Sequence, residues 1–384
     1  MENKKIAIIG GNVSSGGLTA ITRMILRSDA IPDNFKIRYY CSKELYKKIG
    51  EISGKIEVIL SDGFYRKTLK EKLTRSYGKE FIEGIKEWDP DLILFIGEVI
   101  PKELWGYKTV FYLKNQFSFD NRQIRENGFN KLSAVLFHIS LFARRTVRHA
   151  YATVFDTEYS RRGVEKCGYV LKRSKVIYMN VSPDFYDRVP EKKGDIKSPV
   201  ELLYVSSVAP YKHQLEVIKG VCRLKSEGYN VHLSVVGQQL HKAYVKKCKK
   251  YVANNGMNET VDFIEWVDYK KMPELIDDCD VFLNASTLDT LAGPVGEAMA
   301  RGAVIVANKI GFNEETLKDG GIYFDVNDKN SLADALRQVI DSKKLREKLS
   351  NRAKELANEY AKTDTASEYY KFMAELLNKT EEEQ

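Results

Sequence analysis

Two glycines near the start of the sequence could bring backbone amides close to an anion. Gly16 and Gly17 follow the short apolar run 6–9 and directly precede an amphipathic run that begins at Leu18. Backbone N–H groups at the start of a helix point at bound anions, and glycine leaves them accessible. The alternative is an ordinary turn, because turns use glycine freely.

A second candidate segment lies between two carboxylates, Asp289 and Glu297, which have seven residues between them. Just before Pro294, this segment contains Leu291, Ala292 and Gly293. Backbone amides in such a segment can approach a phosphate or a sugar, and proline stiffens the turn because its φ is fixed. The alternatives are a tight connection from strand to helix and, for Glu297, an acidic residue that favours the start of a helix without any ligand.

The elements that must position these residues follow an alternating pattern. Short β-branched runs alternate with amphipathic stretches, and this alternation predicts parallel α/β sheets. In the first half of the chain the predicted strands are 6–9, 37–40, 56–60, 92–95, 110–113, 153–155 and 175–178. In the second half they are 201–205, 231–236, 261–264, 281–283 and 303–307.

The strand pattern restarts after the polar, proline-containing stretch 187–199, which we interpret as a domain boundary. A chain of 384 residues is long enough for two domains that each bury a core. Near the C-terminus, a predicted helix carries an apolar stripe that must be buried against another element. The stripe consists of Tyr369, Phe372, Met373, Leu376 and Leu377.

The composition is that of a folded, soluble protein. Hydrophobic residues make up 43% and charged residues 30%, far from the signature of disorder. The five cysteines are scattered without a CxxC pair, so neither a disulfide framework nor a zinc site is indicated. The first apolar run is too short for a signal peptide or a membrane span. We therefore expect a cytoplasmic protein.

Charge is distributed unevenly along the chain. Residues 1–194 contain 35 Lys and Arg against 23 Asp and Glu, a net charge of +12, whereas the remainder contains 26 against 30, a net charge of −4. A basic half favours an anionic partner, the alternative being a lysine-rich soluble surface. The apolar stretch 132–143, followed by Arg144, Arg145 and Arg148, suggests peripheral docking on anionic lipid at the inner face of the cytoplasmic membrane. The alternative is a buried helix with solvated arginines at its end.

Several chemistries lack their motifs in the sequence. The five histidines do not have metal-ligand spacing and clusters of Asp are absent, so we expect no metal. The glycines near the N-terminus do not match the dinucleotide fingerprint, and there is neither a P-loop nor a G-x-S-x-G elbow. We therefore expect no cofactor. The basic half lacks the interleaved aromatic residues of strand binders, so nucleic acid is not an expected partner.

Three segments carry a resemblance to a known family. Residues 286–302 read STLDTLAGPVGEAMARG, residues 202–214 read LLYVSSVAPYKHQ, and residues 10–26 read GGNVSSGGLTAITRMIL. The first resembles the donor-site signature, and the second the phosphate loop, of the retaining glycosyltransferases of family 4 (glycosyl transferases group 1). Within this family, the sequence is most similar to members that have a serine-rich loop followed by Tyr-Lys-His. Those members are typically bacterial enzymes of surface-polysaccharide assembly.

The resemblance implies an α/β fold of the GT-B type. In this fold two doubly wound, Rossmann-like domains face each other across a cleft, and the C-terminal helix crosses back to the first domain. It implies an N-terminal acceptor domain of residues 1–190 plus about 361–384, and a C-terminal nucleotide-sugar donor domain of residues 198–360.

Carried over to this sequence, the resemblance assigns catalytic and donor-binding roles to Lys212, Asp289 and Glu297. Lys212 would stabilise the diphosphate, which gains negative charge as the sugar leaves, and Glu297 would accept hydrogen bonds from ribose hydroxyls. Asp289 stands where the family usually has Glu, and Ser207 where it usually has Arg. The other donor contacts that the resemblance implies are Gly16, Gly17, Ser207, Trp266, Val267, Leu291, Ala292 and Gly293.

Two of the implied positions have alternatives of their own. Trp266 follows the strand 261–264 and offers a stacking face to a nucleobase, or else is a partly buried core aromatic. Asn115 follows the strand 110–113, where related enzymes often have a His, and can form hydrogen bonds but cannot act as a base. In the front-side mechanism proposed for the family, the departing phosphate oxygen takes the acceptor proton, so a protein base is unnecessary.

The resemblance therefore implies a retaining glycosyltransferase that uses UDP-, GDP- or another nucleotide sugar. The implied acceptor is a glycan or lipid-linked glycan of a bacterial surface polysaccharide. Two alternatives stay open. One is a sugar phosphorylase or sugar-nucleotide hydrolase on the same fold, and the other is a non-catalytic protein that binds an anionic polymer.

Overall fold

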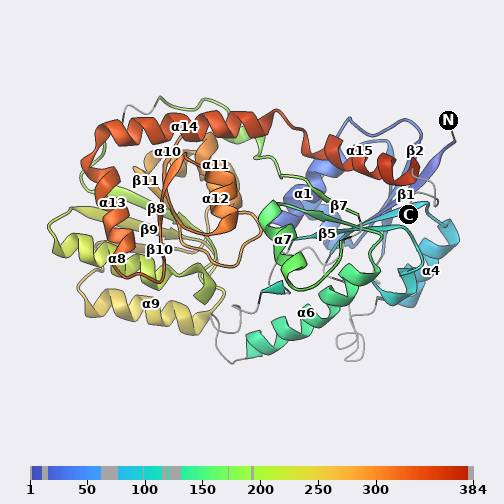
Figure 1. The fold of residues 1–384 in the computed structure, drawn as a ribbon, viewed down its shortest axis with the longest axis horizontal. Helices are drawn as coiled ribbons and strands as arrows, with labels where there is room; N and C mark the ends of the chain where they lie inside the picture. Colours follow the sequence, from blue (N-terminus) through green and yellow to red (C-terminus); the bar gives the residue numbers. More distant parts are fainter. Residues whose placement is uncertain are drawn as a thin grey trace. The chain divides into compact units, whose positions relative to one another are not determined.

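The computed structural model describes residues 2–10, 16–61, 77–97, 99–114, 119–120, 131–171, 173–191 and 194–378. The chain divides into two compact units. Among the described residues, the first unit contains those up to Met179 and those from Thr363 onward, and the second runs from Asn180 to Lys362. Each unit is built on one parallel sheet with helices packed on it (Figure 1).

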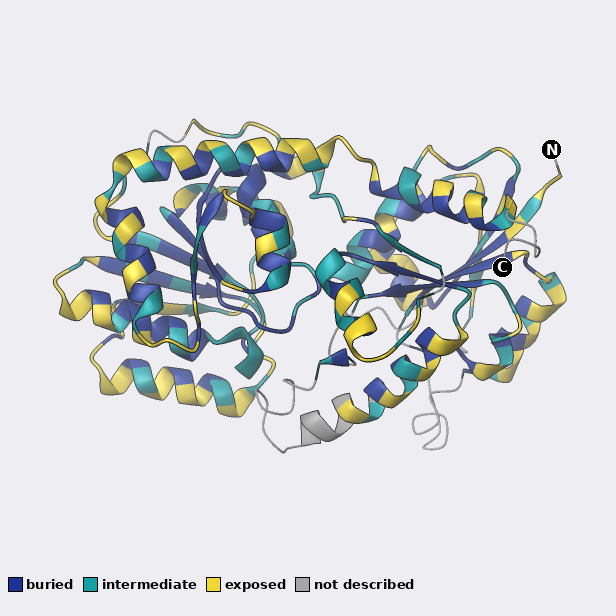
Figure 2. Cartoon of the chain, viewed as in Figure 1, coloured by how far each residue is buried: buried dark blue, intermediate teal, exposed yellow. Residues whose placement is uncertain are grey.

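The sheet of the first unit has seven strands in the order β3-β2-β1-β4-β5-β6-β7, and all neighbouring pairs are parallel. The strands are β1 (Lys4–Gly10), β2 (Phe35–Cys41), β3 (Ile56–Leu60), β4 (Leu92–Ile96), β5 (Thr109–Leu113), β6 (Ala152–Phe155) and β7 (Ser174–Val176). The central strands are buried along almost their whole length, as expected of a parallel sheet covered on both faces (Figure 2).

Helices cover both faces of this first sheet. They are α1 (Gly16–Arg27), α2 (Lys43–Ile49), α4 (Lys79–Trp88), α6 (Lys131–His149), α7 (Glu158–Lys166) and α15 (Thr365–Asn378). Alternate residues of β1 point to opposite faces, so Ile6 and Ile8 join a core with α1 and α15, and Ala7 and Ile9 join another with α4 and α7. The apolar stripe of the C-terminal helix is thus buried in the first unit.

The sheet of the second unit has six parallel strands in the order β10-β9-β8-β11-β12-β13. The strands are β8 (Val200–Val205), β9 (Val231–Val236), β10 (Val261–Ile264), β11 (Val281–Asn284), β12 (Val304–Asn308) and β13 (Gly321–Phe324). Counted from its first strand, this is the 3-2-1-4-5-6 order of the Rossmann fold, and the order reverses between β8 and β11. Ligands of such sheets bind beyond the carboxyl ends of the strands at this reversal.

The helices of the second unit alternate with its strands. They are α8 (Gln214–Ser226), α9 (Lys242–Asn254), α10 (Met272–Asp278), α11 (Gly293–Ala300), α12 (Gly311–Leu317), α13 (Ser331–Asp341) and α14 (Lys343–Ala361). One core contains residues of α8, α9, α13 and α14 packed on the sheet. None of the helices in the described ranges is long and apolar enough to cross a membrane.

A buried arginine anchors the entry into the second unit. The Arg301 guanidinium binds the Asp277 carboxylate, with Nε 2.9 Å from Oδ1. It also donates to the backbone carbonyls of Phe185, Asp187 and Arg188. Because these carbonyls lie in or beside the first residues of the stretch that the sequence suggested as a linker, the start of that stretch is fixed to the second unit.

Candidate functional site

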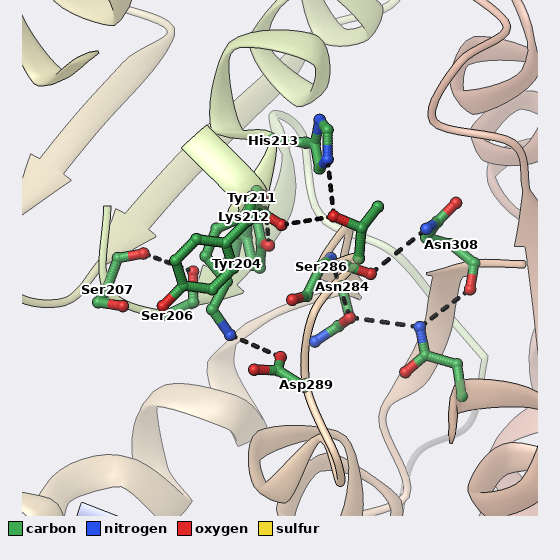
Figure 3. Close-up of polar contacts among 12 residues, drawn as sticks. Tyr204, Ser206, Ser207, Tyr211, Lys212, His213, Asn284, Ser286, Asp289 and Asn308 are labelled. Atoms are coloured by element: carbon green, nitrogen blue, oxygen red, sulfur yellow. Dashed lines mark hydrogen bonds and ion pairs between the residues drawn. The ribbon is translucent and has the colours of Figure 1, made fainter. Parts of the chain in front are cut away.

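The candidate site of the second unit lies where its strand order reverses. Lys212 belongs to the loop that follows β8, and Asp289 belongs to the loop that follows β11. β8 and β11 are neighbours in the sheet, so their carboxyl ends bring the two loops together. The Lys212 Nζ lies 2.6 Å from the Asp289 Oδ2, and both side chains keep some contact with solvent (Figure 3).

The surroundings keep Lys212 charged. Burial by itself lowers the pKa of the Lys212 ammonium, but Asp289 and the hydroxyls of Tyr211 and Tyr204 raise it, and the net shift is upward. The Tyr204 hydroxyl donates to the Lys212 carbonyl across 2.6 Å. Burial raises the pKa of Tyr204 to about 12, so this hydroxyl remains a donor at neutral pH. The loop therefore holds a charged ammonium that is paired with Asp289, and such a group can bind a phosphate.

Close backbone packing sets the start of this loop. Ser206 follows β8, and its amide donates to the Val236 carbonyl at the end of β9. Gly237 has a φ of 144°, and a Cβ at this position would lie 2.2 Å from the Ser206 carbonyl oxygen. The buried Gln214 amide group donates to the Ser206 hydroxyl and to the Ser207 carbonyl, each across 2.9 Å. Ser207 thus lies in the loop, with its carbonyl engaged by α8.

A network of buried asparagines, which lie outside the sequence motifs described above, supports the loop that follows β11. The side chain of Asn308 donates to the Ser286 carbonyl, and Asn313 donates to Asn284 Oδ1 and to the Asn308 carbonyl (Figure 3). The Asn284 Oδ1 also accepts from the Ser286 amide. Each of these asparagines lies at the end of a strand or near the start of a helix. Because buried polar side chains are usually hydrogen-bonded, asparagines at such positions are the sequence feature that could have predicted this network.

Glu297 lies inside helix α11, and not at the start of a helix-like run as the sequence suggested. The helix already begins at Gly293. Pro294 fits its first turn, because an N–H at that position would have no partner within the helix. The interpretation of Glu297 as an acidic residue that favours the start of a helix is therefore wrong.

The Tyr269 hydroxyl donates to the Glu297 Oε1 across 2.8 Å. Burial raises the pKa of Glu297 to about 7 although this hydrogen bond lowers it.

The N-terminus of α11 contains the small-residue segment. Gly293 is the first residue of the helix, and Ala292 precedes it without a side-chain cap. Leu291 is half-buried and Ala292 is buried. Pro294 has no N–H, and the next two amides donate to the Ala292 carbonyl. The Gly293 amide is therefore the donor that this helix start offers to an anion.

Trp266 is exposed, and not a core residue. Its side chain is 71% exposed after the end of β10, and Val267 beside it is half-buried. A large aromatic surface held in solvent is available for stacking. The alternative of a partly buried core aromatic is excluded.

In the first unit, a buried acid fixes a lysine at the end of β5. The Lys114 Nζ lies 2.9 Å from the Asp156 Oδ2, and the Tyr112 hydroxyl donates to Oδ1 across 2.6 Å. Lys114 passes over the start of α1, because a Cβ on Gly17 would lie 3.0 Å from the Lys114 Cε. Gly16 and Gly17 form the first turn of this helix. Asn115 lies outside the described residues.

The described residues contain no group of three or more His, Cys, Asp or Glu side chains that could hold a metal ion. The positions that the sequence suggested in the second unit fall on loops or helix starts at the carboxyl ends of its strands, apart from Glu297. Lys212 and Asp289 are brought into direct contact.

The chain resembles solved glycosyltransferase structures over almost its whole length. Anabaena Alr3699/HepE, solved in complex with UDP and glucose, has a TM-score of 0.71 at 17% identity, covering 97% of this chain and 100% of that chain. A glycosyltransferase from Rickettsia africae has a TM-score of 0.72 at 14% identity, covering 99% and 100%. WaaG, a glycosyltransferase involved in lipopolysaccharide biosynthesis, has a TM-score of 0.69 at 16% identity, covering 98% and 100%.

Comparisons of sequence give a narrower result. No curated protein matches the chain. The family model of glycosyl transferases group 1 matches residues 186–356, which form most of the second unit. The chain thus has the GT-B fold of two Rossmann-like units, and its second unit matches the glycosyl transferases group 1.

Proposed function

We propose that this protein is a retaining glycosyltransferase that transfers a sugar from a nucleotide-sugar donor to a glycan or lipid-linked glycan. The contact between Lys212 and Asp289 carries the proposal, since it places a fixed cation at the ligand-binding reversal of a Rossmann sheet. The family match of residues 186–356 and the UDP bound to HepE support a nucleoside diphosphate as the ligand of this unit.

Each part of a donor finds a complementary group in the second unit. The diphosphate faces the Lys212 ammonium and the Gly293 amide at the start of α11. The ribose hydroxyls donate to Glu297, and the base stacks on the exposed Trp266. As the bond between the sugar and the diphosphate breaks, negative charge grows on the phosphate, and these donors stabilise it more than they stabilise the ground state.

In the retaining reaction the departing phosphate oxygen takes the proton of the acceptor hydroxyl, and the acceptor oxygen bonds to the anomeric carbon on the face that the diphosphate leaves. The basic first unit holds the acceptor, and its charge favours an anionic glycan or lipid. Similarity to WaaG supports a place in surface-polysaccharide synthesis. No metal or cofactor is part of the proposal.

A thermal-shift screen with UDP, GDP, ADP and dTDP sugars tests the donor site, because a ligand that binds the folded state raises the melting temperature. We expect one nucleotide class to stabilise the wild type and Lys212→Ala to lose most of this effect. The control is Lys246→Ala, because Lys246 is an exposed lysine on α9, and this variant should keep the full stabilisation by the nucleotide sugar. If no nucleotide sugar stabilises the wild type, the donor site is refuted.

The stereochemistry and the acceptor are tested with the donor that the screen identifies. NMR of the newly formed linkage should show the anomeric configuration of the donor, and the opposite configuration would exclude a retaining enzyme. Turnover without any glycan, with water or phosphate as the acceptor, would instead identify a hydrolase or phosphorylase.

Helix α6 supports contact with an anionic membrane. Phe137 and Leu141 are 51% and 47% exposed, and Arg145 and Arg148 are exposed further along the helix. Residues four apart lie on one helix face, so apolar and basic side chains follow each other on the exposed side. Flotation with vesicles containing anionic lipid tests this part. Equal flotation of the wild type and an Arg145→Ala/Arg148→Ala variant would refute it.

A further inference from the structure

His213, which follows Lys212, has a backbone conformation that few side chains adopt. Its φ of 53° and ψ of 33° lie in the left-handed region, where a residue with a Cβ is strained and glycine is not. His213 caps the preceding turn and stands directly before α8, so the chain reverses sharply here. A histidine at such a position implies that its side chain contributes an interaction that glycine cannot.

The imidazole of His213 reaches across to the loop that follows β11. Its Nε2 lies 3.1 Å from the hydroxyl of Thr287, a residue that is 6% exposed (Figure 3). The same hydroxyl lies 3.2 Å from the Tyr211 carbonyl, which also accepts from the Thr287 amide across 3.0 Å. The residues on both sides of Lys212 are therefore bound to Thr287.

Both ring nitrogens of His213 face groups that can accept a hydrogen bond. A carbonyl oxygen can only accept, so the single hydroxyl proton of Thr287 goes to Tyr211. The Thr287 oxygen can then accept from a proton on the His213 Nε2. The other ring nitrogen, Nδ1, faces the Glu216 carboxylate at 3.7 Å.

We propose that His213 is a positioning residue whose bond to Thr287 holds Lys212 in the orientation that binds the donor diphosphate. The inference rests on the proposed function, because it names what orients the phosphate-binding cation of that site. The loop from 211 to 213 has a strained backbone and a charged side chain that is mostly buried. Without the bond between the two loops, Lys212 would have to be reordered each time a diphosphate binds, and ligand affinity would fall.

Replacement by glycine separates positioning from stability. His213→Gly removes the imidazole and also relieves the left-handed backbone, so the melting temperature of the free protein should stay the same or rise. Affinity for the nucleoside diphosphate should nevertheless fall about three- to tenfold, the effect of one lost hydrogen bond. Asp89→Gly relieves a similar left-handed residue at the end of α4 in the first unit and should leave affinity unchanged.

Thr287 provides the reciprocal test. Thr287→Val removes the hydroxyl and should weaken binding as much as His213→Gly does. Thr287→Ser keeps the hydroxyl, so this variant should bind the nucleotide with the affinity of the wild type. Because both changes break the same bond, the double variant His213→Gly/Thr287→Val should bind no more weakly than either single variant.

The experiment is isothermal titration of wild type and variants with UDP, GDP, ADP and dTDP, beside their melting temperatures. The inference predicts loss of affinity without loss of stability in His213→Gly, rescue in Thr287→Ser, and non-additivity in the double variant. If the wild type binds a nucleotide and His213→Gly binds it with equal affinity, the role of His213 is overturned, and the proposed function is not. A wild type that binds none of the four nucleotides would refute the proposed function and, with it, this role of His213.

Discussion

The Tyr269 hydroxyl donates a hydrogen bond to the Glu297 carboxylate across 2.8 Å. Burial raises the pKa of Glu297 from its usual 4.5 to about 7, and this hydrogen bond acts in the opposite direction. The ionised form of Glu297 therefore grows as the pH passes through 7. Because an ionised carboxylate is the stronger acceptor, its protonation state couples pH to the binding of ribose hydroxyls.

We expect nucleotide affinity to rise between about pH 6 and pH 8 in the wild type, and to rise less in Glu297→Gln. Tyr269→Phe removes the interaction that lowers the pKa, so the midpoint of the rise should move to higher pH. Titration of all three proteins with one nucleotide measures this, because proton uptake by the nucleotide cancels in the comparison. Identical pH profiles for the wild type and Glu297→Gln would contradict the role of Glu297.

Glu297 also has a predicted effect on stability. A pKa that is higher in the folded than in the unfolded state means that folding binds a proton in the interval between them. The resulting stabilisation is complete below about pH 4.5 and is lost as the pH rises through 7. Glu297→Gln should remove this decline. Urea unfolding at about pH 5 and pH 8 measures it, and an equal decline in both proteins would assign it to other groups.

Arg301→Met should destabilise the second unit by about 3–5 kcal/mol, because it leaves Asp277 without its buried partner and frees three backbone carbonyls. Arg352→Met is the control, since Arg352 also pairs with carboxylates but lies at the surface. The free energy of unfolding from urea titration gives both values. Similar, small losses in the two variants would show that the Arg301 contacts contribute little.

The Lys114–Asp156 pair should behave differently when opposite partners are removed. Lys114→Met leaves a carboxylate that is 1% exposed without its cation, whereas Asp156→Asn leaves a lysine that is 20% exposed and can turn to solvent. We expect the first variant to lose about 2–4 kcal/mol of stability and the second less. A double-mutant cycle in urea measures the coupling. Additive losses would mean that the two side chains do not interact.

Gly237→Ala should displace the loop that carries Lys212. A Cβ would lie 2.2 Å from the Ser206 carbonyl, and the φ of 144° disfavours any side chain, so we expect a loss of at least about 2 kcal/mol. Gly256→Ala is the matched control, because its φ of 64° is also positive but its Cβ would meet nothing within 4 Å. That variant should lose only about 1–2 kcal/mol. Equal losses would show that the close approach to Ser206 is unimportant.

The strands could be predicted from the sequence because a buried parallel strand is a short β-branched run. All twelve predicted strands are present, with ends that differ by up to two residues. The strand β13 (Gly321–Phe324) was missed, since it has only four residues and begins with glycine, which has a low strand preference. The apolar stripe of the C-terminal helix was also predicted, and its side chains, among them Tyr369 and Phe372, are buried in the core of the first unit.

The resemblance of two short segments to a known family identified Lys212, Asp289 and Glu297 as candidates, because each segment is continuous in the sequence. Only the tertiary structure decided that Lys212 and Asp289 touch, since they are 77 residues apart and meet because β8 and β11 are neighbours in the sheet. The same holds for the exposure of Trp266, the bond between His213 and Thr287, and the place of Glu297 inside α11. Strand order and burial are set by long-range packing, and the local sequence pattern does not contain them.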